Sequence, residues 1–137
     1  MLEPKPPQPG QNQAEGKERL KKRILFAEDD ENNRKYITRF LLREGYEVET
    51  VKNGQELLEK LATEEFDAVI ADNTMPVMSG IEALKKIREN ARFKNLPVII
   101  QSGYEEIKET VERLGGIFIQ KPFSFDEFKK EVEKALE

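Results

Sequence analysis

The chain has 137 residues, enough for one domain of ordinary size with a buried core. It contains no cysteine and no histidine, which excludes disulfides, thiolate nucleophiles and imidazole catalysis and leaves oxygen atoms as the ligands of any metal. The net charge of -4 disfavours nucleic acid as a partner of this domain, and without a membrane-length apolar run or a signal peptide pattern we expect a soluble, cytoplasmic protein that does not bind membranes.

Residues 1–22 differ in composition from the rest of the chain. They contain four prolines and several Gln and Gly residues, and between Leu2 and Leu20 they carry no sizeable apolar side chain. We therefore predict a flexible Pro/Gln-rich linker or tail over 1–22, either native or added for expression, and a folded domain over 23–137.

From Ile24 onward, short apolar runs alternate with stretches of helical periodicity. Continuous apolar runs are typical of strands that are covered on both faces, whereas the second run alternates apolar and polar residues as an edge strand does. The predicted strands cover residues 24–27, 47–51, 67–71, 98–100 and 117–119.

Each predicted strand is followed by a helical pattern, and several of these patterns carry start or stop signals. Ser79 with Glu82, and Ser124 with Glu127, form Ser-x-x-Glu capping boxes, and Gly45 stands where a helix would end. Five alternating strand and helix units predict an α/β fold of (βα)5 flavodoxin-like type, a doubly wound five-stranded parallel sheet with strand order 2-1-3-4-5.

Polar residues follow four of the predicted strands: Glu28 and Asp29 the first, Asp72 the third, Ser102 the fourth and Lys121 the fifth. The carboxyl ends of parallel strands share one edge of the sheet, so these side chains should converge. Carboxylates about 4 Å apart repel by about 4 kcal/mol at an effective dielectric of 20, and a cation must offset this repulsion. Mg2+, or Mn2+ in its place, suits such a site, and the set suits phosphoryl transfer to Asp72.

These motifs resemble those of the receiver domains of two-component response regulators, the CheY-like superfamily. The resemblance extends from about Ile24 to Leu136. It rests on Glu28-Asp29, on residues 67–80 (DAVIADNTMPVMSG), on Ser102-Gly103 and on Lys121-Pro122-Phe123, in this order.

The resemblance implies a role for each residue. Asp72 would be the phosphoacceptor, and Glu28, Asp29, Asp72 and the backbone carbonyl of Thr74 would hold Mg2+. Lys121 would pair with the phosphoryl group, and the bond from Lys121 to the following proline would be cis.

Ser102 and Phe118 stand at the switch positions of the family. The alternatives remain open from the residues alone: Ser102 can be a strand-end hydroxyl bonded to backbone, Phe118 a core aromatic, and Glu28 with Asp29 an acidic pair at a helix N-terminus.

The implied function is that of a receiver in two-component or phosphorelay signalling. The chain would accept a phosphoryl group from a sensor histidine kinase or a histidine phosphotransfer domain and change conformation to control an attached or separate output protein. It would promote only its own phosphorylation and dephosphorylation and would not be an enzyme. The run over 28–34 (EDDENNR) is also similar to that of receivers attached to hybrid histidine kinases.

Two other functions would use parts of the same pattern. A receiver-like docking module would use the same fold without phosphorylation. A phosphohydrolase of the haloacid dehalogenase type would need a second Asp two residues after the nucleophile, where this chain has Thr74.

The chain departs from the family pattern in two places. The interval from Ser102 to Lys121 is about three residues short, which shortens the fourth helix or the loop after it. This puts the usual output surface, formed by the fourth helix, the fifth strand and the fifth helix, in doubt as a partner site. Asn73, which follows the predicted acceptor, is polar where many members have an apolar residue.

Overall fold

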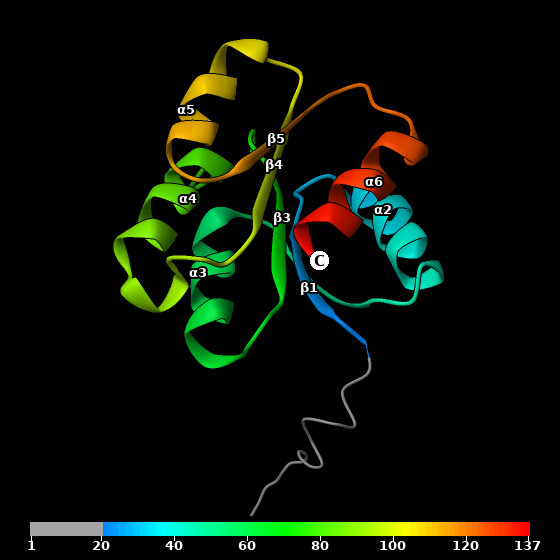
Figure 1. Cartoon of the computed structure of the whole chain (residues 1–137), viewed down its shortest axis with the longest axis horizontal. Helices are drawn as coiled ribbons and strands as arrows, with labels where there is room; N and C mark the ends of the chain where they lie inside the picture. Colours follow the sequence, from blue (N-terminus) through cyan, green and yellow to red (C-terminus); the bar gives the residue numbers. More distant parts are fainter. Residues whose placement is uncertain (1–20) are drawn as a thin grey trace, which may run out of the picture.

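A five-stranded parallel sheet runs through the centre of the molecule (Figure 1), and its strands are in the order β2-β1-β3-β4-β5. The predicted fold class and strand order are therefore confirmed. The computed structural model describes residues 21–137, so the predicted linker lies almost wholly outside the described residues and stays a prediction. The strands are β1 (Arg23–Ala27), β2 (Glu47–Val51), β3 (Ala68–Asp72), β4 (Val98–Ser102) and β5 (Ile117–Gln120).

Helices cover both faces of the sheet (Figure 1). Two of them, α2 and α6, pack on one face, and α3, α4 and α5 pack on the other. Within residues 21–137, no helix has the length and apolar character needed to cross a bilayer. The helices are α2 (Glu31–Arg43), α3 (Gly54–Thr63), α4 (Gly80–Glu89), α5 (Lys108–Arg113) and α6 (Phe125–Ala135), with 3-10 turns η2 (Ala91–Phe93) and η3 (Glu105–Ile107).

The predicted helix signals form as local contacts. The Ser79 hydroxyl accepts a hydrogen bond from the Glu82 N–H at 3.1 Å, and the Glu82 carboxylate accepts one from the Ser79 N–H at 2.9 Å. Ser124 and Glu127 repeat this capping box at 3.1 and 2.9 Å. Gly45 follows α2 with a φ of +96°, a conformation that glycine adopts without strain. Short-range signals therefore fix where these helices begin and end.

The core divides into two clusters, one on each face of the sheet. Strand side chains alternate between them, because successive residues of a strand point to opposite faces. Phe26 of β1 and Phe128 of α6 are fully buried in the cluster beneath α2 and α6, where the rings of Phe40 and Phe125 also stack 4.5 Å apart. Each fully buried large side chain stabilises the fold by about 1.5 to 3 kcal/mol.

Several strands extend further than their apolar runs suggest. β3 includes Asp72 and β4 includes Ser102, because the sheet hydrogen bonds continue past the last apolar residue, as in the 2.9 Å bond from the Asn73 N–H to the Gln101 carbonyl. The fourth predicted helix is short, as expected from the reduced interval. It consists of a 3-10 turn and α5, whose buried residue is Val111.

Candidate functional site

Three carboxylates meet at the carboxyl edge of the sheet. Glu28 directly follows β1, Asp29 comes next, and Asp72 ends β3, and one oxygen of each lies within 4.8 Å of the others. The side chain of Asp29 is exposed, whereas Glu28 and Asp72 are only 3% and 5% exposed. The predicted convergence of these residues is thus observed, and two of the three charges lie out of contact with bulk water.

Backbone groups orient the two buried carboxylates. The Asp30 N–H donates to Glu28 Oε2 at 3.1 Å, and the Thr74 N–H donates to Asp72 Oδ2 at 3.0 Å. The other oxygen of Asp72, Oδ1, forms an ion pair with the Lys121 ammonium. Lys121 directly follows β5, and its ammonium contacts the acidic group, as its position after that strand predicted.

Burial, and to a smaller extent the neighbouring carboxylates, disfavour the charged form of Glu28 in the acidic group. Burial raises the pKa of Glu28 from 4.5 to about 7, and the carboxylates of Asp72 and Asp29 act in the same direction, against the Asp30 hydrogen bond and the charge of Lys121. One ammonium group does not balance three carboxylates. A divalent cation would complete the balance.

The donor set fits Mg2+ or Mn2+. Both ions prefer oxygen ligands and bind through a few carboxylates together with water. Glu28, Asp29 and Asp72 offer three such oxygens within 4.8 Å of one another. The predicted fourth ligand, the Thr74 carbonyl, belongs to an exposed residue directly beyond the site, and its role remains a prediction.

The two predicted switch residues lie on the opposite face from Asp72. Ile100 pairs with Phe118 in the β4–β5 ladder, and Ser102 comes two residues after Ile100, so Ser102 and Phe118 share the face that α5 covers. Ser102 is 3% exposed, and its hydroxyl oxygen accepts a 3.0 Å hydrogen bond from the Tyr104 N–H. Within residues 21–137 the hydroxyl hydrogen has no acceptor, so it is still available for donation. Phe118 is partly buried against the core.

The loop between β3 and α4 is anchored by Asn73, to which sequence reasoning gave no role. Its carbonyl accepts from the Gly80 N–H and its side-chain oxygen accepts from the Ile81 N–H, both at 3.0 Å. A Cβ atom at Gly80 would lie 2.8 Å from the Asp72 carbonyl oxygen, so only glycine allows this close approach. The signal was available: a polar side chain near the start of a helix can bond to its free N–H groups.

Gln101 is a second residue that the sequence analysis missed. It belongs to β4, is 2% exposed, and its amide oxygen has no hydrogen-bond partner within residues 21–137. Its only sequence signal is its polarity in an otherwise apolar strand. The cis peptide bond between Lys121 and Pro122 is present as predicted.

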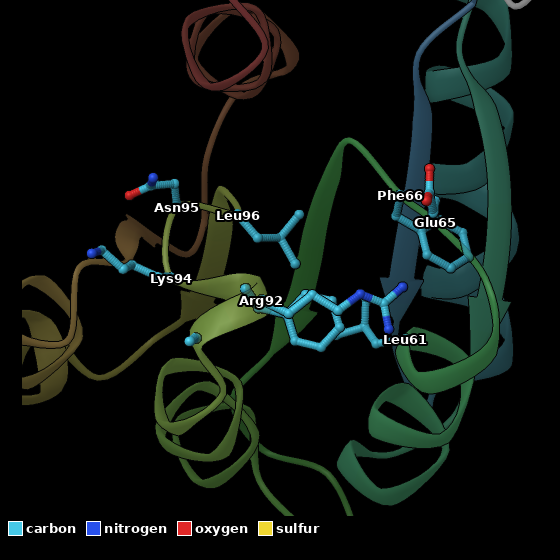
Figure 2. Close-up of a pocket in the computed structure, with 9 residues that line it drawn as sticks. Leu61, Glu65, Phe66, Arg92, Lys94, Asn95 and Leu96 are labelled. Atoms are coloured by element: carbon cyan, nitrogen blue, oxygen red, sulfur yellow. The ribbon is translucent and has the colours of Figure 1, made fainter. Parts of the chain in front are cut away.

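A hollow of about 500 Å3 lies away from this site (Figure 2). It is lined by Phe66 and Leu96, which stand two residues before β3 and β4, and therefore lies at the amino edge of the sheet. Arg92 and Glu65 contribute charge to its lining. The hollow contains none of the predicted site residues, so its size does not identify the functional site.

The comparisons with known proteins agree with the fold and identify the family. The family model "Response regulator receiver domain" matches residues 24–133. The regulatory protein AtoC of Escherichia coli is 35% identical over 118 residues, which are 84% of this chain and 25% of AtoC. The chain thus spans about a quarter of that relative.

Two solved structures illustrate the structural similarity. The response regulator TrrA of Thermotoga maritima, solved in complex with Mg(2+)-BeF, is 35% identical with a TM-score of 0.77, and the match covers 84% of this chain and 99% of TrrA. The receiver domain of a signal transduction histidine kinase from Syntrophus aciditrophicus is 26% identical with a TM-score of 0.77, covering 84% of this chain and 89% of that one. The chain therefore belongs to the response regulator receiver domain family.

Proposed function

We propose that this domain accepts a phosphoryl group on Asp72 from the phosphohistidine of a sensor histidine kinase or a histidine phosphotransfer domain. A carboxylate oxygen of Asp72 would form the new bond to phosphorus while the bond from phosphorus to the histidine nitrogen breaks, and the histidine leaves with its electron pair. The observation that carries the proposal is the meeting of Glu28, Asp29 and Asp72 within 4.8 Å, with Lys121 paired to the acceptor.

Each residue of the site would have one task. Glu28, Asp29, Asp72 and the Thr74 carbonyl would hold Mg2+, or Mn2+, and the bound ion would neutralise charge on the phosphoryl oxygens. The Lys121 ammonium would exchange part of its contact with Asp72 for a phosphoryl oxygen. The Ser102 hydroxyl would donate its hydrogen to another phosphoryl oxygen.

The modification would act as a conformational switch. It adds negative charge beside a buried carboxylate and would shift an equilibrium between two arrangements of the edge formed by β4 and β5. Ser102 and Phe118 lie on the face of that edge that α5 covers, which supports their assignment as switch residues.

A groove of about 460 Å3 follows β5 and α6, with Phe118, Phe123 and Lys130 in its lining. Because α5 is short and does not line this groove, we propose the β5 and α6 surface for contact with an attached or separate output protein. Such a receiver would work in the cytoplasm, where its kinase partner's catalytic domains reside.

Phosphorylation in the presence of Mg2+ tests the proposal. Incubation with acetyl phosphate should add one acid-stable, alkali-labile phosphoryl group to the protein, and Asp72→Asn should abolish its incorporation because the nucleophilic carboxylate is gone. Mass spectrometry of the intact protein measures this. The proposal would be wrong if Asp72→Asn were modified at the wild-type rate.

Asp30→Asn is a matched control, because Asp30 caps α2 beside the site and Asn caps helices equally well. This variant should be phosphorylated normally. A wild-type protein that takes no phosphoryl group at saturating Mg2+ would instead favour the docking module without phosphorylation.

A further inference from the structure

Gln101 is a buried polar residue that the proposed phosphoryl transfer does not use. It is 2% exposed, and its amide oxygen, Oε1, is buried without a hydrogen-bond partner in the described part of the chain. An unpartnered buried acceptor destabilises a fold and therefore requires an explanation, one of which is a donor supplied in another state of the molecule.

The sheet places Gln101 between two residues of the site. Ile70 of β3, Ile99 of β4 and Ile119 of β5 all belong to the core cluster beneath α2 and α6. Residues two apart along a strand share a face. Asp72, Gln101 and Lys121 each come two residues after one of these isoleucines, so they lie on the same face. Lys121 lies just past the end of β5, but its N–H still donates to the Ser102 carbonyl at 2.8 Å, so the strand pattern continues to it.

The strand register shows how close these positions are. Asp72 is the direct partner of Gln101 in the β3–β4 ladder, and Gln101 is the direct partner of Ile119 in the β4–β5 ladder. Lys121 is therefore the diagonal neighbour of Gln101 on the same face. Diagonal neighbours in a sheet are within reach of long side chains such as Lys and Gln.

The Lys121 ammonium has a donor to spare. It carries three N–H groups, and its ion pair within residues 21–137 is with Asp72 Oδ1. A phosphoryl group on Asp72 would change the position that this ammonium prefers. The residue that carries this donor and the residue with the unpartnered buried acceptor are thus diagonal neighbours in the sheet.

We infer that Gln101 is a positioning residue for Lys121, whose ammonium donates to the Gln101 amide oxygen when Asp72 carries a phosphoryl group. The inference rests on the proposed function and adds to it a residue that acts through Lys121. The hydrogen bond satisfies the buried amide oxygen in the phosphorylated state and keeps the ammonium aimed at the phosphoryl oxygens.

Replacement by methionine tests the inference, because Gln101→Met keeps the length of the side chain and removes its hydrogen-bonding atoms. The rate of phosphorylation by acetyl phosphate at saturating Mg2+ should fall roughly tenfold, the effect of losing one hydrogen bond to a charged group. The Mg2+ dissociation constant should stay unchanged, since Gln101 is not one of the proposed ligands. Thr38→Val is the matched control: it removes another buried, unpartnered oxygen, on α2, and should leave the rate unchanged.

The Lys121→Met background separates positioning from a general effect on folding. If Gln101 acts through Lys121, adding Gln101→Met to Lys121→Met should change the residual rate less than twofold. An equal tenfold loss in both backgrounds would overturn the inference while leaving the proposed function intact. A wild-type protein that accepts no phosphoryl group overturns both, and this is seen before any variant is made.

A spectroscopic measurement gives a readout besides the rate. In protein labelled at glutamine, the side-chain amide signal of Gln101 should shift when Mg2+ and beryllofluoride, a phosphoryl analogue, are added. The shift should be lost in Lys121→Met and retained in Thr38→Val. An amide signal that shifts equally with and without the Lys121 ammonium would overturn the inference.

Discussion

The two edges of the sheet differ in how their charges are balanced. At the amino edge, Arg23 pairs with Glu64 at 3.0 Å and with Glu47 at 3.5 Å, and its guanidinium lies 4.6 Å from the centre of the Phe66 ring. At the carboxyl edge, Glu28 and its two acidic neighbours face one ammonium group. The first arrangement stabilises the fold, whereas the second holds unbalanced charge that a cation or a phosphoryl transfer would use. The position of a functional site is thus visible as the edge where charge is left unbalanced.

The pH dependence of stability should have opposite signs at the two edges. Burial raises the pKa of Glu28 to about 7, so the stability that this group contributes is fully present below pH 4.5 and is lost as the pH rises to about 7. The hydrogen bond from Arg23 lowers the pKa of Glu64, so its contribution is present above pH 4.5 and is lost as the pH falls. Above neutral pH, the stability of the metal-free protein should therefore be limited by the ionised Glu28 at its carboxyl edge.

Glu28→Gln should give the largest effect, because it removes the group with the raised pKa. Without metal at pH 8, its free energy of unfolding should exceed that of the wild type by about 3 kcal/mol, at about 1.4 kcal/mol per unit of pKa shift. The difference should vanish near pH 4.5. Urea unfolding in a chelating buffer over this pH range measures it, and a difference that does not depend on pH would contradict the assignment to Glu28.

Mg2+ should offset the imbalance at the carboxyl edge. At a concentration a hundredfold above its dissociation constant, it should raise the free energy of unfolding by about 2.7 kcal/mol. Asp29→Asn should lose most of this gain at the same Mg2+ concentration, because a ligand charge is removed. Thermal unfolding with and without Mg2+ checks the effect, and equal stabilisation of the variant and the wild type would remove Asp29 from the ligand set.

The sequence predicted the part of the site that depends on strand ends and missed the residues whose roles depend on the folded loop and on burial. Asp72 and Lys121 were predicted because each follows an apolar run, and parallel strands bring such positions together. Asn73 was missed although its bond from the Ile81 N–H spans only eight residues, and Gln101 was missed because its burial arises from the packing of elements far apart in the sequence. The position of Ser102 inside β4 was also missed, since hydrogen bonding rather than hydrophobicity sets the end of the strand.

Arg23→Met tests the contribution of the ion pairs at the amino edge to stability. It should lower the free energy of unfolding by about 1 to 2 kcal/mol, because two ion pairs and a hydrogen bond to the Glu65 carbonyl at 2.8 Å are lost from a partly buried guanidinium. Arg113→Met is the control, since Arg113 pairs with Glu109 on an exposed helix surface and should contribute less than about 0.5 kcal/mol. Urea unfolding measures both variants, and Mg2+ affinity should be unchanged in each.

The smallest effect concerns backbone strain in the loop that follows the acceptor. Val77 has a φ of +68°, which is unfavourable for a β-branched residue by about 1 to 2 kcal/mol, and its side chain is 79% exposed and packs little. Val77→Gly removes this strain, but glycine also makes the unfolded chain more flexible, which offsets about half of the gain. The variant should therefore be more stable by about 0.5 to 1 kcal/mol in urea unfolding. Lys94→Gly, at an exposed position with a φ of -58°, relieves no strain and should be destabilising. If both substitutions destabilised the protein equally, the positive φ at Val77 would carry no strain, and the carboxyl edge would differ from the amino edge in its charge alone.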